Sequence, residues 1–311
     1  MESRSERIIS EVKKVIVGKD EIIEKVLMTI LAGGHILLED VPGVGKTTLA
    51  LGFSKALGIS YRRVQFTPDT MASDVLGFSV YDKSTGKFTY KSGAVFTNLF
   101  LGDEINRTSA KTQAALLEAM EELQITIDGV TRKLPEPFVC IATQNPLGSA
   151  GTHPLPDSQL DRFMVRLSLG YPTVEDTINI VKERETSNPL ETVESVVTAE
   201  EILRMKSEVS AVYAADEILR YTAVLCEKTR HLQDAEQGVS PRAALAALQM
   251  AKAKAFITGR DYVVPDDIKY VFCDVCAHRL ILTPKAKIKK ITAESLIEEV
   301  LKTTDAPKPV K

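Results

Sequence analysis

A short glycine-rich stretch near the start of the chain has the composition of a phosphate-binding loop. It consists of Pro42, Gly43, Val44, Gly45, Lys46, Thr47 and Thr48, and lies between the apolar run HILLE and a helical pattern. Glycines let successive backbone N–H groups point at a phosphate chain, and the following helix adds its positive end. We expect Lys46 to reach the β and γ phosphates and the Thr47 hydroxyl to ligate Mg²⁺. The stretch predicts a nucleotide site.

One position departs from the usual pattern of such loops. That pattern begins with a glycine five residues before Gly45, and this chain has Asp40 there. Like charges repel, so the Asp40 carboxylate must point away from the phosphates or be neutralised.

Two adjacent carboxylates, Asp103 and Glu104, follow the buried-strand pattern NLFLG. We expect Asp103 to hold the Mg²⁺ shell through a water and Glu104 to polarise an attacking water. The other interpretation is a solvated strand end with a helix-capping acid. Hydrolysis is implied more by Glu104 than by any other residue. A kinase that transfers phosphate would also need an acceptor site, and none is evident.

Three further polar residues stand where they are able to complete such a site. Asn145 follows the strand pattern FVCIAT, Arg162 ends the last helix of the first region, and Arg242 begins a helix after Ser240–Pro241. An amide orients water without adding charge, and arginine stabilises charge that develops on phosphate. The alternatives are a turn signal for Asn145 and a surface ion pair for Arg162. A cation at a helix start is unfavourable, and a nearby phosphate would offset that penalty for Arg242.

The elements that must position these residues fall into two regions. Five short apolar runs predict parallel strands: His35–Glu39, Tyr61–Phe66, Asn98–Gly102, Phe138–Thr143 and Met164–Leu169. After Tyr171–Pro172 the pattern predicts helices: Val174–Glu185, Ala199–Glu208, Ala215–Arg230, Pro241–Thr258 and Pro265–Leu280. The sequence thus predicts an α/β domain over 1–171, a helical domain over 172–304 and a frayed tail over 305–311.

Two segments interrupt the α/β pattern. FSVYDKSTGKFTY, within 66–96, alternates around Lys83–Lys87, and QITIDGVTRKL, at 124–134, has Asp128–Gly129 at its centre. Both predict hairpins. They are either decoration or contact surfaces for a partner or substrate.

Composition limits the class of protein. The 311 residues carry a net charge of −3, no tryptophan and 6% aromatic residues, which disfavours nucleic acid as a partner. Forty-four per cent of residues are hydrophobic, as in an ordinary globular chain. Neither a signal-peptide core nor a membrane-length apolar run is present, so we expect a cytoplasmic protein.

The order of the motifs resembles that of the AAA+ ATPases, and within them the MoxR family. The resemblance covers nearly the whole chain. It rests on LAGGHILLEDVPGVGKT, QFTPDTMASDVLG, DEINRTSAKTQAALLEAMEE, IATQNP, LPDSQLDRFM and SPRA. It implies an AAA+ core with a parallel five-stranded sheet, a smaller all-helical lid, and Mg²⁺-dependent ATP hydrolysis with ATP and ADP as ligands.

The resemblance also implies roles for single residues. Lys46 and Thr47 resemble the Walker A pair, and Asp103 and Glu104 the Walker B pair. Asn145 resembles sensor 1 and Arg242 sensor 2. Val17 and Gly18 would lie near the adenine. Arg162 resembles the arginine finger, which completes a neighbour's site and so implies a ring, generally a hexamer. Members of the family are thought to remodel protein partners, often with von Willebrand A domains, and sometimes to assist metal insertion.

Two alternatives remain open from the residues. A nucleic-acid motor has its best local support in the lysines of Pro284–Lys290. A nucleotide-dependent scaffold, or a chelatase-like subunit, is the other, although a pure binder does not need a placed carboxylate such as Glu104.

Overall fold

The structure is a computed structural model that describes residues 3–145, 155–186 and 188–307. The chain forms two compact units. The first consists of Met1–Leu27, His35–Arg162 and Leu167–Leu203, and the second of Met28–Gly34, Phe163–Arg166 and Arg204–Lys311. The first unit therefore extends past Tyr171–Pro172, where the sequence pattern changes, to Leu203. Of the predicted tail, residues 308–311 lie outside the described residues.

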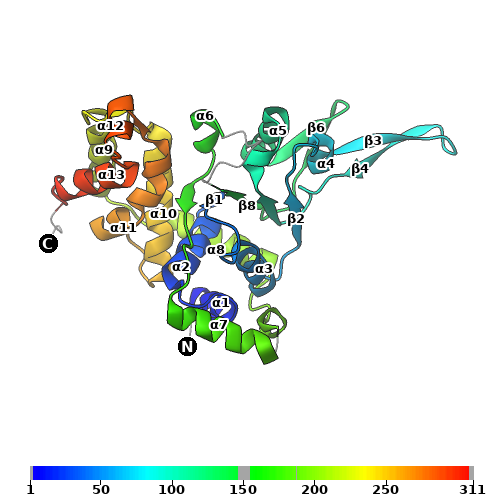
Figure 1. Cartoon of the computed structure of the whole chain (residues 1–311), viewed down its shortest axis with the longest axis horizontal. Helices are drawn as coiled ribbons and strands as arrows, with labels where there is room; N and C mark the ends of the chain where they lie inside the picture. Colours follow the sequence, from blue (N-terminus) through cyan, green and yellow to red (C-terminus); the bar gives the residue numbers. More distant parts are fainter. Residues whose placement is uncertain (1–2, 146–154, 187, 308–311) are drawn as a thin grey trace. The chain divides into compact units, whose positions relative to one another are not determined.

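A five-stranded sheet with the order β2-β5-β8-β1-β9 organises the first unit (Figure 1). Its strands are β1 (Ile36–Glu39), β2 (Tyr61–Gln65), β5 (Leu99–Asp103), β8 (Val139–Gln144) and β9 (Val165–Leu167). The neighbours β2 and β5, β5 and β8, and β8 and β1 pair in parallel. The inner strands are almost wholly buried, as their apolar runs predicted, whereas the edge strand YRRVQ carries charge. The predicted parallel sheet is confirmed.

Helices and short turns connect the strands of the first unit. They are α1 (Arg4–Lys13), α2 (Asp20–Leu31), α3 (Lys46–Ala56), α4 (Ala72–Leu76), η1 (Ile105–Arg107), α5 (Ala110–Glu122), α6 (Asp157–Leu160), α7 (Val174–Thr186), η2 (Pro189–Thr192) and α8 (Ala199–Ala211), which continues into the second unit. Local sequence explains their starts. Ser3 and Glu6 form a capping box at α1, and the Ser109 hydroxyl caps α5.

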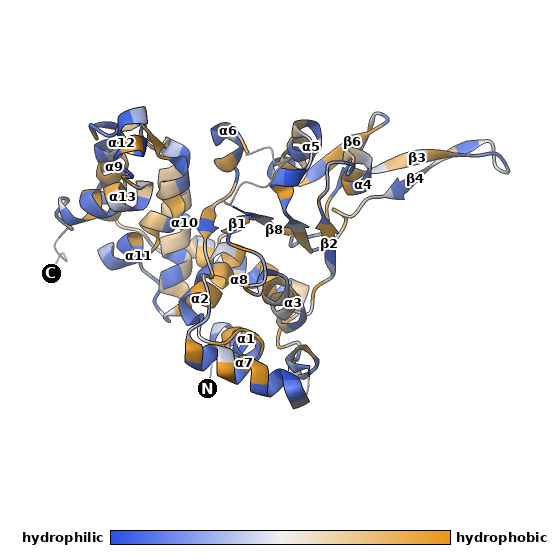
Figure 2. Cartoon of the chain, in the orientation of Figure 1, coloured by the Kyte–Doolittle hydropathy of each residue, from blue (hydrophilic) through white to orange (hydrophobic). Residues whose placement is uncertain are grey.

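A hairpin occupies each of the two interrupting segments. β3 (Gly77–Asp82) pairs with β4 (Lys87–Ser92), and β6 (Gln124–Ile127) with β7 (Val130–Lys133). Asp128 and Gly129 both have positive φ, as a two-residue hairpin turn requires. The β3–β4 hairpin exposes apolar surface, visible along β3 in Figure 2: Phe78 is 49% exposed and Phe88 73%.

The second unit is helical apart from one short antiparallel pair. Its helices are α9 (Asp216–Arg230), α10 (Pro241–Ile257), α11 (Pro265–Cys276), η3 (Ala277–Arg279), α12 (Pro284–Ile288) and α13 (Ala293–Lys302), and β10 (Ala235–Gln237) pairs with β11 (Ile281–Leu282). One face of α10 carries a row of buried alanines, among them Ala243, Ala247 and Ala251. They lie in the core of this unit, where their small side chains allow close helix packing. Within the described part of the chain, no helix is long and apolar enough to cross a membrane.

Candidate functional site

The glycine-rich loop joins β1 to α3 and has the backbone of an anion cradle. Gly43 has φ +87° and Gly45 φ +99°, a region that side chains other than glycine rarely adopt. A Cβ at Gly43 would meet no heavy atom within 4 Å, so open space lies beside the loop. α3 begins at Lys46, directly after Gly45. The loop and the helix N-terminus therefore offer backbone donors to the same space, which fits a phosphate group.

Lys46 lies across the loop that precedes it. Its Nζ donates to the backbone oxygens of Asp40, at 2.7 Å, and of Val41, at 3.3 Å. Burial lowers the pKa of Lys46, and the negative charges of Asp40, Asp103 and Glu104 oppose that decrease. The ammonium group thus stands among carboxylates at the end of the loop, where a phosphate would attract it further.

Asp40 does not face the loop space. Its carboxylate accepts hydrogen bonds from the Ser168 hydroxyl and from the backbone N–H groups of Leu169 and Gly170, at 2.7, 2.7 and 3.0 Å. The residue is 5% exposed. The expectation that this side chain must point away from phosphates or be neutralised is met by these donors.

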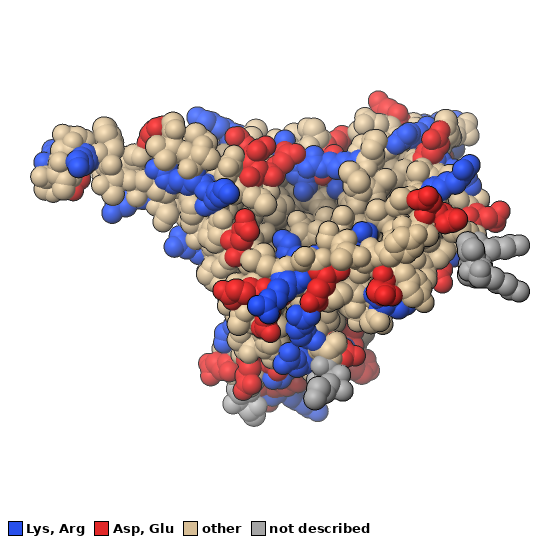
Figure 3. All heavy atoms as spheres, turned by 180° about the vertical axis from the view of Figure 1, so that it is seen from behind, with Lys and Arg blue, Asp and Glu red and all other residues tan. Residues whose placement is uncertain are grey.

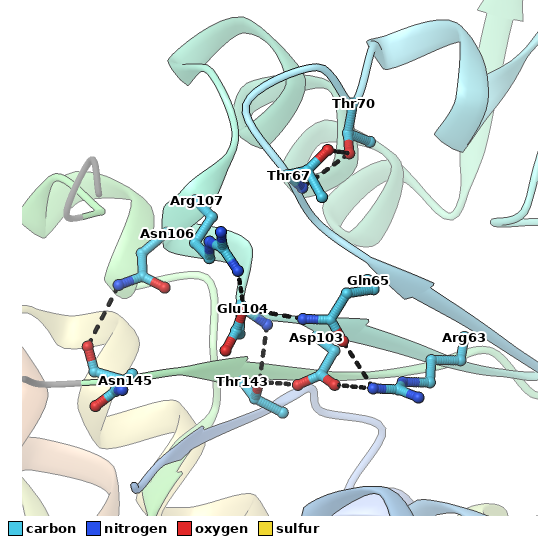
Figure 4. Close-up of polar contacts among 10 residues, drawn as sticks. All are labelled: Arg63, Gln65, Thr67, Thr70, Asp103, Glu104, Asn106, Arg107, Thr143 and Asn145. Carbon is cyan, nitrogen blue, oxygen red and sulfur yellow. Dashed lines mark hydrogen bonds and ion pairs between the residues drawn. The ribbon is translucent and has the colours of Figure 1, made fainter. Parts of the chain in front are cut away.

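The two carboxylates at the end of β5 are held through Thr143 on the neighbouring strand β8. The buried Thr143 hydroxyl donates to Asp103 Oδ1, at 2.6 Å, and accepts from the Glu104 N–H, at 2.9 Å. Glu104 has φ +57°, an unusual value for a residue other than glycine. This turn of the backbone sends the side chains of Asp103 and Glu104 in different directions (Figure 4).

Strand β2 supplies two further partners (Figure 4). Arg63 donates to Asp103 Oδ2 at 2.6 Å, and Gln65 donates from Nε2 to Glu104 Oε2 at 2.9 Å. Arg107, one turn after Glu104, donates to the same Oε2 at 2.8 Å. Arg63 and Gln65 are two residues apart, so they share one face of the strand. Each carboxylate therefore has its own basic or amide partner.

These elements surround one cavity of about 520 Å³. Of the predicted site residues, it is lined by Val17, Pro42, Gly43, Val44, Gly45, Lys46, Thr47, Thr48, Asp103, Glu104 and Asn145. Gly18 is next to Val17 but does not line the cavity. It has φ +72°, and a Cβ there would overlap the carboxylate of Asp176 on α7. The carboxyl ends of β1, β5 and β8 thus bring their predicted residues together.

The two predicted arginines belong to different units. Arg162 follows α6, forms an ion pair with Glu121 on α5 and does not line the cavity. Arg242 lies in the first turn of α10, in the second unit. Their predicted roles, one at a neighbour's site and one at the nucleotide, stay predictions.

The sequence motifs did not predict several of the residues that line the cavity. Arg63 and Gln65 come from the edge strand, and Thr177, Ile180, Glu183 and Arg184 from α7. The i, i+3 and i+7 spacing of the α7 residues marks one helix face. The only sequence signal for Arg63 and Gln65 is a pair of polar residues two apart at the end of a strand, and many solvated strands share it.

The arrangement suits hydrolysis of a phosphoanhydride. Thr47 is the second residue of α3 and Asp103 ends β5. Both line the cavity, so a hydroxyl and a carboxylate are present for a hard cation such as Mg²⁺. Such an ion would compete with the Arg63 guanidinium for Asp103 Oδ2. Glu104 and Asn145 line the same space, and a carboxylate and an amide are groups that orient a water.

Comparison with known proteins agrees with this geometry. The model of the ATPase family associated with various cellular activities (AAA) matches residues 35–165, and that of the AAA lid domain residues 227–300. The chain is 44% identical to the uncharacterized protein YeaC of Bacillus subtilis, over 97% of this chain and 94% of YeaC. It is 37% identical to the chaperone MoxR1 of Mycobacterium tuberculosis, over 97% of this chain and 82% of MoxR1.

A solved structure is similar over almost the whole length as well. The crystal structure of a Cytophaga hutchinsonii protein superimposes with a TM-score of 0.92 at 38% identity, covering 98% of this chain and 95% of that one.

Proposed function

Because the chain belongs to the MoxR family of AAA+ ATPases, we propose that it uses Mg²⁺-dependent ATP hydrolysis to remodel protein partners. The observation that carries the proposal is the single cavity lined by Lys46, Thr47, Asp103, Glu104 and Asn145. These residues come from the phosphate loop and two neighbouring strand ends. Loops and strand ends far apart in the chain converge on one space, as a nucleotide site requires.

In this proposal each residue has one task. The backbone of Gly43–Gly45 and the Lys46 ammonium group bind the phosphates, and Val17 and Gly18 lie beside the base. Thr47 and Asp103 would hold Mg²⁺, Asp103 through a water as the sequence predicts, and the bound ion would supply positive charge to the phosphates. Glu104 accepts a proton from the attacking water, and Asn145 orients that water. Arg242 has the sensor 2 role that the resemblance implies.

The proposal is tested with the purified full chain. We expect it to release phosphate from ATP in the presence of Mg²⁺. We expect EDTA in excess over Mg²⁺ to abolish that release, because Thr47 and Asp103 carry no positive charge and the ion that they would hold neutralises the phosphates. Addition of Mg²⁺ beyond the EDTA should restore it. Phosphate release that continues in EDTA would contradict the assigned roles of Thr47 and Asp103.

We also propose that the chain forms a ring, generally a hexamer, in which Arg162 completes a neighbour's site. Its ion pair with Glu121 leaves it outside its own cavity, which supports a role at another subunit. We expect Arg162→Ala to lower phosphate release at least about 100-fold, since an arginine that acts across an interface contributes that much or more.

Mixing separates this role from a loss of folding. Arg162→Ala subunits keep an intact Glu104, and Glu104→Gln subunits keep an intact Arg162, so a mixed ring contains some complete sites. We expect mixing the two inactive variants to restore part of the activity. A mixture as inactive as its components would count against a shared site.

The partner class follows from the family and from one surface. We propose protein partners, with von Willebrand A domain proteins and assistance to metal insertion as the finer assignment. The β3–β4 hairpin supports contact with proteins, because Phe78, Tyr81 and Phe88 are 49%, 52% and 73% exposed.

Nucleic acid is the less favoured partner. Acidic and basic side chains are interspersed on the face drawn in Figure 3. The lysines of Pro284–Lys290 are exposed around the short helix α12. Stimulation of phosphate release by DNA or RNA, and not by a von Willebrand A domain protein, would reverse this ranking.

A further inference from the structure

Asp40 stands where phosphate loops of this type usually have glycine, and it has two sets of contacts. Its backbone oxygen accepts from Lys46 Nζ at 2.7 Å. Its carboxylate accepts from three consecutive residues, Ser168, Leu169 and Gly170, as described above. One residue thus connects the phosphate-binding lysine to a segment about 130 residues later in the chain.

We propose that Asp40 is a positioning residue that ties the phosphate loop to 168–170 and thereby fixes α7 as a wall of the nucleotide cavity. The inference rests on the proposed function in taking this cavity as the nucleotide site. Asp40 touches no reacting group in this scheme. It acts through the backbone of the segment that leads into α7.

The segment after Gly170 leads directly to the cavity. Lys19, which itself lines the cavity, donates from Nζ to the Tyr171 oxygen at 2.9 Å. The Thr173 hydroxyl accepts from the Asp176 N–H at 3.1 Å, which caps the first turn of α7. Further along α7, Thr177, Ile180 and Arg184 line the cavity. Movement of 168–170 would therefore displace a wall of the site.

A carboxylate suits this position better than other groups. The three donors consist of one hydroxyl and two backbone N–H groups, so the anchor, itself only 5% exposed, must accept three hydrogen bonds. A carboxylate accepts all three, and bonds to an ionised acceptor are stronger than neutral ones. In asparagine, the Nδ2 group would face the N–H of Leu169 or Gly170, two donors directed at each other. Asp40 has no positive φ, so the backbone does not demand the usual glycine.

The test compares Asp40→Asn and Asp40→Gly with a matched control. Asp267 on α11 is also a buried carboxylate, 3% exposed, that accepts from a backbone N–H, that of Val264, and from Arg260. Asp267→Asn therefore removes a similar anchor in the second unit. Two quantities are measured on the full chain: hydrogen exchange of the 173–185 amides without nucleotide, and the dissociation constant of N-methylanthraniloyl-ADP.

We expect both Asp40 variants to speed exchange across α7 about tenfold and to weaken binding of the labelled ADP about tenfold, the size of effect that charged hydrogen bonds produce. Asp267→Asn should leave both quantities within about twofold of the wild type. This holds even if its melting temperature falls as much as that of the Asp40 variants. Ser168→Ala removes one donor from an exposed side chain and should give a smaller change in the same direction.

Different results would contradict the role of Asp40 and the proposed function. If the Asp40 variants lose stability as Asp267→Asn does, but α7 exchange and ADP binding stay near the wild-type values, the inference is overturned and Asp40 is merely structural. If Asp40→Asn does not fold, unchanged α7 exchange in Ser168→Ala overturns it. A wild-type chain that binds no labelled ADP would refute the proposed function instead, and exchange of α7 without nucleotide would still decide whether Asp40 holds it.

Discussion

Replacing Glu104 by glutamine is expected to lower phosphate release at least about 100-fold while ATP binding stays within about twofold of the wild type, because a general base contributes about 10²–10⁴ to rate and little to ground-state affinity. An amide accepts no proton from water at neutral pH. The substitution is nearly isosteric, and the glutamine oxygen keeps an acceptor for Gln65 and Arg107, which both donate to Glu104 Oε2. Phosphate release and nucleotide binding are measured on the same preparation.

A matched control is available on a neighbouring helix. Glu118→Gln makes the same chemical change at an exposed position of α5 and should leave phosphate release unchanged. Phosphate release above about a tenth of the wild-type rate in Glu104→Gln would refute the role of this carboxylate, since an essential base gives a larger loss.

A variant that binds ATP without hydrolysing it also gives the best bait for the partner, because it holds the ATP-bound state.

The second large effect is expected at Lys46. Lys46→Ala should weaken binding of ATP and ADP about 100-fold or more, because it removes a charge-assisted contact to phosphate at a half-buried site. The negative charges of Asp103 and Glu104, which now interact with the Lys46 ammonium group, would then repel the phosphates without that compensation. Binding is measured with labelled ADP, and phosphate release with ATP at a concentration that saturates the wild type.

Lys55→Ala is the control for this change. Lys55 lies in the last turn of the same helix α3, and its Nζ donates to the Leu190 oxygen outside the phosphate loop. The two variants lose the same side chain from one helix, so a general effect on α3 should appear in both. If Lys46→Ala binds ADP as Lys55→Ala does, the loop is not the phosphate site.

The site could be predicted in part because its main residues belong to continuous motifs. Gly43, Gly45 and Lys46 are adjacent in the chain, and a loop of this composition before a helix has one common use. Asp103 and Glu104 follow an apolar run that had to be a buried strand, so their carboxylates had to emerge at its end. Parallel strands then place their carboxyl ends at one edge of the sheet.

The missed residues depend on contacts between distant segments. Arg63 reaches Asp103 because β2 is the neighbour of β5, an order that no local pattern of apolar residues records. Thr143 is equally ordinary as a sequence feature, a hydroxyl at the end of an apolar run. It becomes the bridge between Asp103 and Glu104 only because β8 pairs with β5.

The sequence by itself determined the fold class, the family and the position of the glycine-rich loop between β1 and α3, since these are encoded in local periodicity and in contiguous motifs. It also showed that Asp40 was out of place in such a loop. Only the tertiary structure decided what Asp40 does, by bringing its carboxylate against the N–H groups of Leu169 and Gly170. The physical reason is that a buried carboxylate is stabilised by donors close in space, and the distance along the chain to those donors does not enter its energy.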